Sequence, residues 1–152
     1  MERYREKIRR IMICVNVIDG IYDSIAKKTG VKESVLTLLY ALDDGAAHFQ
    51  KEICEEWFIP KTTLNTVIRE FVEKGYVTLN AGWRGNGKEK QVCLTEAGRI
   101  FARDILNRVY DLEQRAMEKA LPRLSDDFVG ELGCFTACLK NEAERFGEGR
   151  NI

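Results

Sequence analysis

The stretch that decides the fold runs from residue 50 to residue 98 and reads QKEICEEWFIPKTTLNTVIREFVEKGYVTLNAGWRGNGKEKQVCLTEAG. In order, it contains a short helix, a turn closed by Pro60, a second helix rich in small polar residues, and two strands joined by a basic tip. Pro60 suits the start of the second helix, because its missing N–H would have no partner there. Glycines 82, 85 and 87 permit the positive φ angles of a hairpin tip. This order predicts a winged helix-turn-helix.

The second helix of this stretch has two faces of different chemistry. Its apolar side chains recur at helical spacing and should pack inward: Leu64, Val67, Ile68 and Phe71. The other face carries short polar and basic side chains, which suit a DNA major groove: Lys61, Thr62, Thr63, Asn65, Thr66 and Arg69. The alternative is an ordinary surface helix, but such a helix is more usually lined with Glu and Lys.

Positive charge is concentrated here, although the net charge of the whole chain is zero. Between residues 61 and 92 there are three Glu and six Lys or Arg, the latter at positions 61, 69, 74, 84, 88 and 90. Arg84, Lys88 and Lys90 lie on or beside the hairpin tip, where they could hold phosphates. A neutral chain can therefore still bind nucleic acid, since its charge is partitioned.

Helical patterns flank the winged segment on both sides. Residues 4–28 and 31–44 precede it, and residues 95–121 follow it with Thr95 as the N-cap. A helix of about 25 residues spans close to 40 Å, which is longer than one winged domain requires. A last helix is expected over residues 125–146. The fold class is therefore mainly α, an α+β winged helix with added N- and C-terminal helices.

The first of these helices has more apolar surface than one small core needs. One stripe follows the three-and-four spacing: Ile8, Ile11, Met12, Val15, Ile18, Tyr22 and Ile25. Cys14 and Val17 widen this surface, which suggests a second buried face and hence a partner.

Four pieces of the chain, in register, resemble the multiple antibiotic resistance regulator (MarR) family of bacterial transcription factors: TLLYAL at 37–42, QKEICEEW at 50–57, IPKTTLNTVIREFVEKGYV at 59–77 and LTEAGR at 94–99. The resemblance implies a homodimeric repressor on a pseudo-palindromic operator in double-stranded DNA, released by a small-molecule effector or by oxidation. It also implies one domain over residues 1–152. In that domain, 31–98 form the winged helix, 95–121 a connecting helix, and 1–30 with 122–148 the dimerisation helices.

The wing departs from the pattern of this family. Relatives usually carry an Asp that holds an Arg two residues later, and the Arg enters the minor groove. Counting back from Leu94 and Thr95, these positions hold Asn86 and Lys88. Because lysine lacks the planar fork of arginine, this change motivates an alternative function, a winged-helix protein-interaction module without specific DNA binding.

The resemblance also suggests where regulation would act. The family's ligand pocket lies between the DNA-binding lobe and the interface helices, which makes Ile18, Tyr22 and Tyr40 candidate lining residues. Each could equally be plain core packing. Peroxide-sensing relatives place a reactive cysteine in the first helix, which makes Cys14 the candidate for a thiol-based redox switch. We expect Cys14 to be buried among apolar neighbours, a setting that does not lower a thiol pKa.

The remaining cysteines and the lone histidine predict no site of their own. The five cysteines form no Cys-x-x-Cys pair, and their odd number favours reduced thiols. Cys134 and Cys138 lie one helical turn apart and are expected to fill core volume. His48 is expected in a loop, as a solvated or capping residue, and one histidine makes a metal site improbable.

Several functions are disfavoured by what the sequence lacks. It shows no nucleophile, base and acid arrangement and no phosphate-binding loop, so we expect no catalytic residues, no cofactor and no metal. It has no signal peptide and no apolar run long enough to cross a membrane, so we expect a cytoplasmic protein without a membrane partner.

Overall fold

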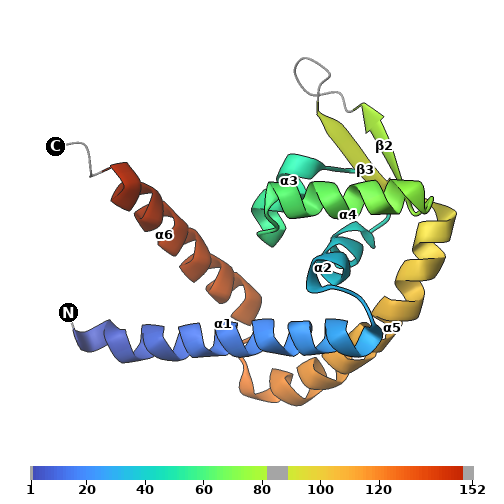
Figure 1. The fold of residues 1–152 in the computed structure, drawn as a ribbon. Helices are drawn as coiled ribbons and strands as arrows, with labels where there is room; N and C mark the ends of the chain where they lie inside the picture. The colour runs from blue at the N-terminus through green and yellow to red at the C-terminus, as the bar shows by residue number, and fades with distance from the viewer. Residues whose placement is uncertain (1, 82–88, 149–152) are drawn as a thin grey trace. The chain divides into compact units, whose positions relative to one another are not determined.

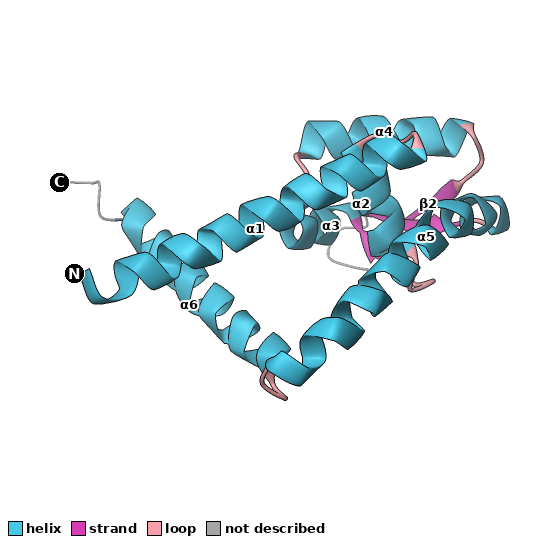
Figure 2. Cartoon of the chain, turned by 90° about the horizontal axis from the view of Figure 1, so that it is seen from below, coloured by secondary structure: helices cyan, strands magenta, loops and turns pink. Residues whose placement is uncertain are grey.

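A computed structural model describes residues 2–81 and 89–148 of the chain. Helices dominate and the strands form one small sheet (Figures 1 and 2). The elements follow in the order α1 Glu2–Thr29, α2 Glu33–Leu42, β1 His48–Phe49, α3 Gln50–Trp57, α4 Lys61–Glu73, β2 Val77–Ala81, β3 Lys90–Leu94, α5 Glu96–Ala120, a 3-10 turn Leu121–Arg123 and α6 Phe128–Glu148. The mainly α winged helix predicted from the sequence is confirmed. The chain divides into two compact units, Met1–Tyr110 and Asp111–Ile152.

The sheet of the first unit is antiparallel, with its strands in the order β1-β3-β2. In the β2–β3 hairpin, Val77 lies opposite Leu94 and Ala81 lies opposite Lys90. On the other side of β3, His48 of β1 lies opposite Val92. The sequence prediction of a loop at His48 was wrong, because a two-residue strand is too short to show an alternating pattern.

The core of the first unit lies where α2, α4 and α5 meet the sheet. Leu38, Leu39, Leu42, Leu64 and Leu106 are among its fully buried side chains. The apolar face predicted for the second helix is buried as a whole, and that helix is α4. Burial of this face aims the opposite, polar face of α4 outward.

A compact junction joins the end of α4 to the start of α5. Gly75 has a φ of 73° and lies just after the end of α4. The Thr95 hydroxyl donates to the Gly75 carbonyl oxygen (2.6 Å) and accepts from the Gly98 N–H (3.0 Å), which makes it the predicted N-cap of α5. Beside these bonds, the Tyr76 and Phe101 rings stack at 4.5 Å between centroids. The end of α4 and the start of α5 are therefore held together at this junction.

The long helices leave much apolar surface uncovered within one chain. In α1 only the C-terminal end packs on the core, whereas Ile13, Val17 and Ile21 are exposed. In the second unit, Val129 and Phe146 of α6 are exposed as well.

This exposure corrects the expectation for three cysteines. Cys14 of α1, and Cys134 and Cys138 of α6, are exposed instead of buried. Helical spacing shows that their helices are amphipathic, but it does not show whether the same chain covers the apolar face.

No helix within residues 2–81 and 89–148 is both long enough and apolar enough to span a bilayer.

The junction generates a test of how the fold is held. A Cβ at position 98 would overlap the carbonyl oxygen of Tyr76, which is backbone and cannot turn away. Gly98→Ala should therefore lower the free energy of unfolding by at least about 2 kcal/mol, measured by urea denaturation. Ala97→Ser changes the exposed neighbouring position and should stay within about 0.5 kcal/mol of the parent. Equal stability of the two variants would show that the junction is not tight.

Candidate nucleic-acid interface

Helices α3 and α4 are joined by a three-residue turn, Phe58 to Pro60. Phe58 has a φ of 52°, so the backbone reverses there through the left-handed region, and its side chain is 92% exposed. Ile59 is buried and ties the turn to the core. The Pro60 carbonyl accepts from the Leu64 N–H at 2.9 Å and so begins α4. These are the parts of a helix-turn-helix, with α4 in the recognition position.

The outward face of α4 carries the side chains that the sequence singled out. Lys61, Asn65 and Arg69 recur every four residues, which places them in one row, and all three are exposed. Thr62 and Thr66 are exposed beside that row, and the Thr66 hydroxyl donates to the Thr62 carbonyl at 3.0 Å. Thr63, which the sequence placed on the same face, is half-buried at its edge.

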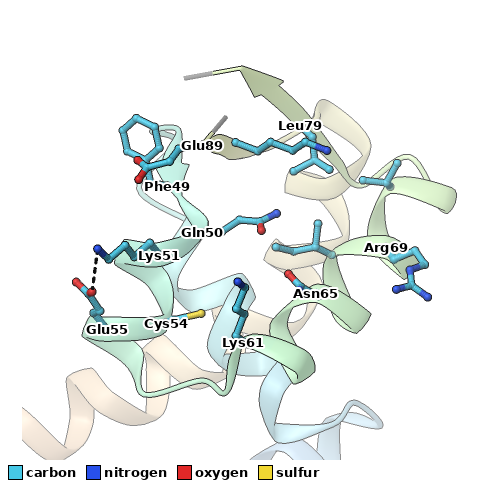
Figure 3. A pocket seen from close by; sticks show the side chains of 13 residues that line it. Phe49, Gln50, Lys51, Cys54, Glu55, Lys61, Asn65, Arg69, Leu79 and Glu89 are labelled. Atoms are coloured by element: carbon cyan, nitrogen blue, oxygen red, sulfur yellow. Dashed lines mark ion pairs between the residues drawn. The ribbon is translucent and has the colours of Figure 1, made fainter. Parts of the chain in front are cut away.

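A groove of about 790 Å³ runs along this row, between α3, α4 and the sheet (Figure 3). Its lining residues come from several elements: Phe49, Gln50, Lys51, Cys54, Glu55, Lys61, Asn65, Ile68, Arg69, Val72, Leu79, Glu89 and Lys90. Four of them are Lys or Arg and two are Glu. The groove is thus positive on balance, with apolar side chains such as Leu79 in its wall.

Sequence reasoning missed the contribution of α3 to this groove. Figure 3 shows Gln50 and Lys51 at the start of α3, across the groove from Asn65. The Lys51 ammonium lies 3.9 Å from the Glu55 carboxylate, and both side chains are largely exposed. The two side chains of an exposed ion pair hold each other only weakly, so the Lys51 ammonium can bind a phosphate instead. In the sequence, the position of Lys51 in the first turn of the supporting helix was the signal that could have pointed to this role.

The predicted wing contacts are only partly described. Lys90 begins β3 and lines the groove. Arg84 and Lys88, together with Asn86 of the altered wing pattern, lie outside the described residues.

Strand β1 leads directly into α3, and its His48 is braced by local hydrogen bonds. The His48 Nε2 lies 2.9 Å from both carboxylate oxygens of Asp44, and the Ala46 N–H donates to the same carboxylate at 2.9 Å. The hydrogen bond with His48, followed by that from Ala46, lowers the pKa of Asp44 below its ordinary value. His48 therefore lies in a strand and is bonded to Asp44, and it is not a solvated loop residue.

A second hollow of about 410 Å³ lies elsewhere in the first unit, between α1, α2 and the end of α3. It brings together the three residues proposed for ligand binding, Ile18, Tyr22 and Tyr40. The other lining residues are Asp19, Glu33, Leu36, Thr37 and Trp57.

Two further expectations concern the Cys14 thiol and metal binding. Cys14, the candidate redox thiol, is exposed on α1 and does not line either hollow. Among the described residues, no group of three or more His, Cys, Asp or Glu could hold a metal ion.

Comparison with known proteins finds a family similarity over the helix-turn-helix. Residues 29–82 match the sequence model of the MarR family, and this span contains α2, β1, α3, α4 and β2. Over this span the chain is similar to the MarR family.

Solved structures extend the likeness from the MarR segment to the whole fold. A MarR family regulator from Neisseria meningitidis, NMB1585, superposes with a TM-score of 0.71 at 20% identity, covering 97% of this chain and 98% of that one. For the regulator SPO1453 from Silicibacter pomeroyi DSS-3 the TM-score is 0.67 at 16% identity, with 87% and 93% covered. MepR of S. aureus, in its DNA-binding conformation, gives a TM-score of 0.67 at 12% identity, with 90% and 98% covered. A search among curated proteins finds no match.

The Asp44 brace of this MarR fold has a defined pH dependence. Because the folded-state pKa of Asp44 is lowered, its stabilisation is full above the ordinary carboxyl range and is lost as pH falls through the folded value, below about pH 4. Asp44→Asn should therefore be less stable than the parent at pH 7, by under about 1 kcal/mol for so exposed a pair.

Urea unfolding of the parent and Asp44→Asn at pH 7 and pH 3 measures this difference, which should shrink at pH 3. Asp104→Asn, an exposed acid on α5, is the control and should show no comparable change. A difference of the same size at both pH values would contradict a role for the ionised carboxylate.

Proposed function

We propose that this protein is a homodimeric, sequence-specific DNA-binding repressor that acts in the cytoplasm on a pseudo-palindromic operator. One observation carries the proposal: the exposed row of α4 borders a groove lined by four cations, in a chain with no net charge. DNA phosphates supply the charge that such a groove attracts. The fold likeness to MepR, solved in a DNA-binding conformation, supports the same reading. No catalytic step and no cofactor enter the proposal.

The contacts divide between bases and phosphates. Helix α4 would enter the major groove, where Thr62, Thr63, Asn65 and Thr66 meet base edges. An amide can pair with adenine through two hydrogen bonds, so Asn65 is the strongest candidate for base reading. The phosphates would be held by the cations of the groove and wing: Lys51, Lys61, Arg69, Arg84, Lys88 and Lys90.

A second subunit would cover the apolar surfaces of α1 and α6. Ile13, Val17 and Ile21 form a row four residues apart, and Val17 is 55% exposed. A continuous exposed apolar row of this kind usually marks an interface. Residues 1–30 and 122–148 are the proposed dimerisation helices, residues 31–98 the winged helix and 95–121 the connecting helix. A two-fold dimer would present two α4 helices to half-sites about one helical turn apart.

The hollow that contains Ile18, Tyr22 and Tyr40 is the proposed site of a small effector. Its volume of about 410 Å³ lies in the range of small-molecule sites. Its wall includes Trp57, the last residue of α3, so an occupant would touch the helix-turn-helix directly. Release from the operator would follow if the ligand binds the free conformation more tightly than the DNA-bound one.

The roles of individual side chains predict two different losses. Asn65→Ala should bind the best duplex selected from a random library about tenfold more weakly, while its binding to unrelated duplexes stays unchanged. Lys90→Ala should weaken binding to all duplexes alike and reduce the slope of log K against log salt by about one. Fluorescence anisotropy at four salt concentrations measures both effects.

Lys140→Ala, an exposed cation on α6, serves as the charge control and should leave affinity and salt slope unchanged. Uniform losses on every duplex for both Asn65→Ala and Lys90→Ala would refute the division of roles. Failure of the parent protein to enrich any duplex would refute the proposed function itself.

The proposed dimer has its own test. Val17→Lys places a charge in the apolar row of α1, and burying an unpaired charge costs several kcal/mol. Sedimentation equilibrium at micromolar concentration should show a dimer for the parent and a monomer for Val17→Lys. Asn16→Lys adds the same side chain on the polar side of α1 and should remain dimeric. A monomeric parent would contradict the proposal.

A further inference from the structure

The hollow between α1, α2 and the end of α3 has a lining of unusual composition. Three of its eight lining residues are aromatic: Tyr22, Tyr40 and Trp57. Two others are acids, Asp19 of α1 and Glu33 of α2. Among the described residues, no Lys or Arg lines it. Its charge is therefore opposite in sign to that of the groove along α4.

The Tyr40 ring of the hollow is held in place by contacts with two other rings. Tyr40 packs against Trp57 with 5.6 Å between ring centroids and a tilt of 58°. It also meets Tyr110 of α5 edge-on at 5.5 Å, and the Tyr110 hydroxyl donates to Asp43 at 2.7 Å. Rings that are fixed before a ligand arrives lose little freedom when it binds.

The two acids that line the hollow come from different helices, Asp19 from α1 and Glu33 from α2. The nearby cation Lys27 feels the charge of Glu33, but its ammonium is paired with Asp23 at 2.5 Å. Asp23 is the main cause that raises the pKa of Lys27, and Glu33 acts in the same direction. The field of Glu33 on this side of the molecule thus favours positive charge.

We infer that this hollow binds an organic cation, namely a quaternary or tertiary ammonium group carried on an apolar or aromatic body. The faces of tyrosine and tryptophan rings attract such a cation through their quadrupoles. The carboxylates of Asp19 and Glu33 add a Coulomb attraction that an anionic ligand would feel as repulsion. The apolar body would lie on Ile18 and Leu36. This inference names the chemical class of the effector in the proposed function. Binding of the cation does not depend on that function, and only its effect on DNA binding rests on it.

Trp57 makes this inference measurable without DNA. The chain has two tryptophans, so Trp83→Phe leaves Trp57 as the sole emitter excited at about 295 nm. The probes are benzyltrimethylammonium, its neutral isostere neopentylbenzene, and the anion phenylacetate. Quenching of Trp57 by each probe gives its affinity. Calorimetry on the parent protein repeats the benzyltrimethylammonium titration, so the result does not depend on the Trp83→Phe variant.

We expect benzyltrimethylammonium to bind at least about tenfold more tightly than neopentylbenzene, and phenylacetate to bind least. Asp19→Asn and Glu33→Gln keep the shape of each side chain and remove its charge. Each substitution should lower the affinity for benzyltrimethylammonium about three- to tenfold and leave the affinity for neopentylbenzene unchanged. Asp104→Asn removes an acid that does not line the hollow and should change neither affinity.

Equal affinities for the cation and its neutral isostere, tighter binding of phenylacetate, or no binding of any probe would each overturn the inference. Duplex binding by the same variants separates this failure from that of the proposed function. A protein that reads its selected duplex but shows no cation preference keeps the proposed function and loses the cation site. If the protein prefers the cation but selects no duplex, the cation site stands and the proposed function fails.

Discussion

The Thr95 hydroxyl joins three elements whose relative positions decide what the first unit presents to solvent. It donates to the carbonyl of Gly75, where α4 has ended, and accepts from the N–H of Gly98 in the first turn of α5. Strand β3 ends at the residue before it. Because α4, β3 and α5 meet at this point, the outward row of α4 has one orientation relative to the sheet. The missing side chain of Gly98 permits that close approach.

The sequence was most informative where periodicity and special residues coincide. The burial of Leu64 and Phe71 and the cap at Thr95 were both predicted, since each follows from local chemistry. Strand β1 was missed because its pairing is with residues more than forty positions away. The contribution of Lys51 was missed because its position in the first turn of α3 does not by itself show that α3 borders a groove shared with α4 and the sheet. The exposure of Cys14 and Cys138 could not be read from one chain's amphipathicity.

A net charge of zero hides two hollows of opposite character in the first unit. The groove along α4 gathers cations, and the hollow beside α1 gathers acids and rings. Helix α3 belongs to both: Lys51 in its first turn lines the groove, and Trp57 at its end lines the hollow. A helix of eight residues therefore borders two environments that attract opposite charges. A short rigid element in contact with both is a direct physical link between the proposed DNA and effector sites.

Phe58 stands where most proteins would place glycine, in the left-handed region at the end of α3. A side chain there costs roughly 1 kcal/mol in backbone energy. It also removes many of the conformations that a glycine would sample, in the folded and unfolded chain alike. The turn between α3 and α4 is consequently stiff as well as strained. The restricted backbone conformations of Phe58, together with the packing of the core beneath the turn, therefore limit the range of angles between α3 and α4.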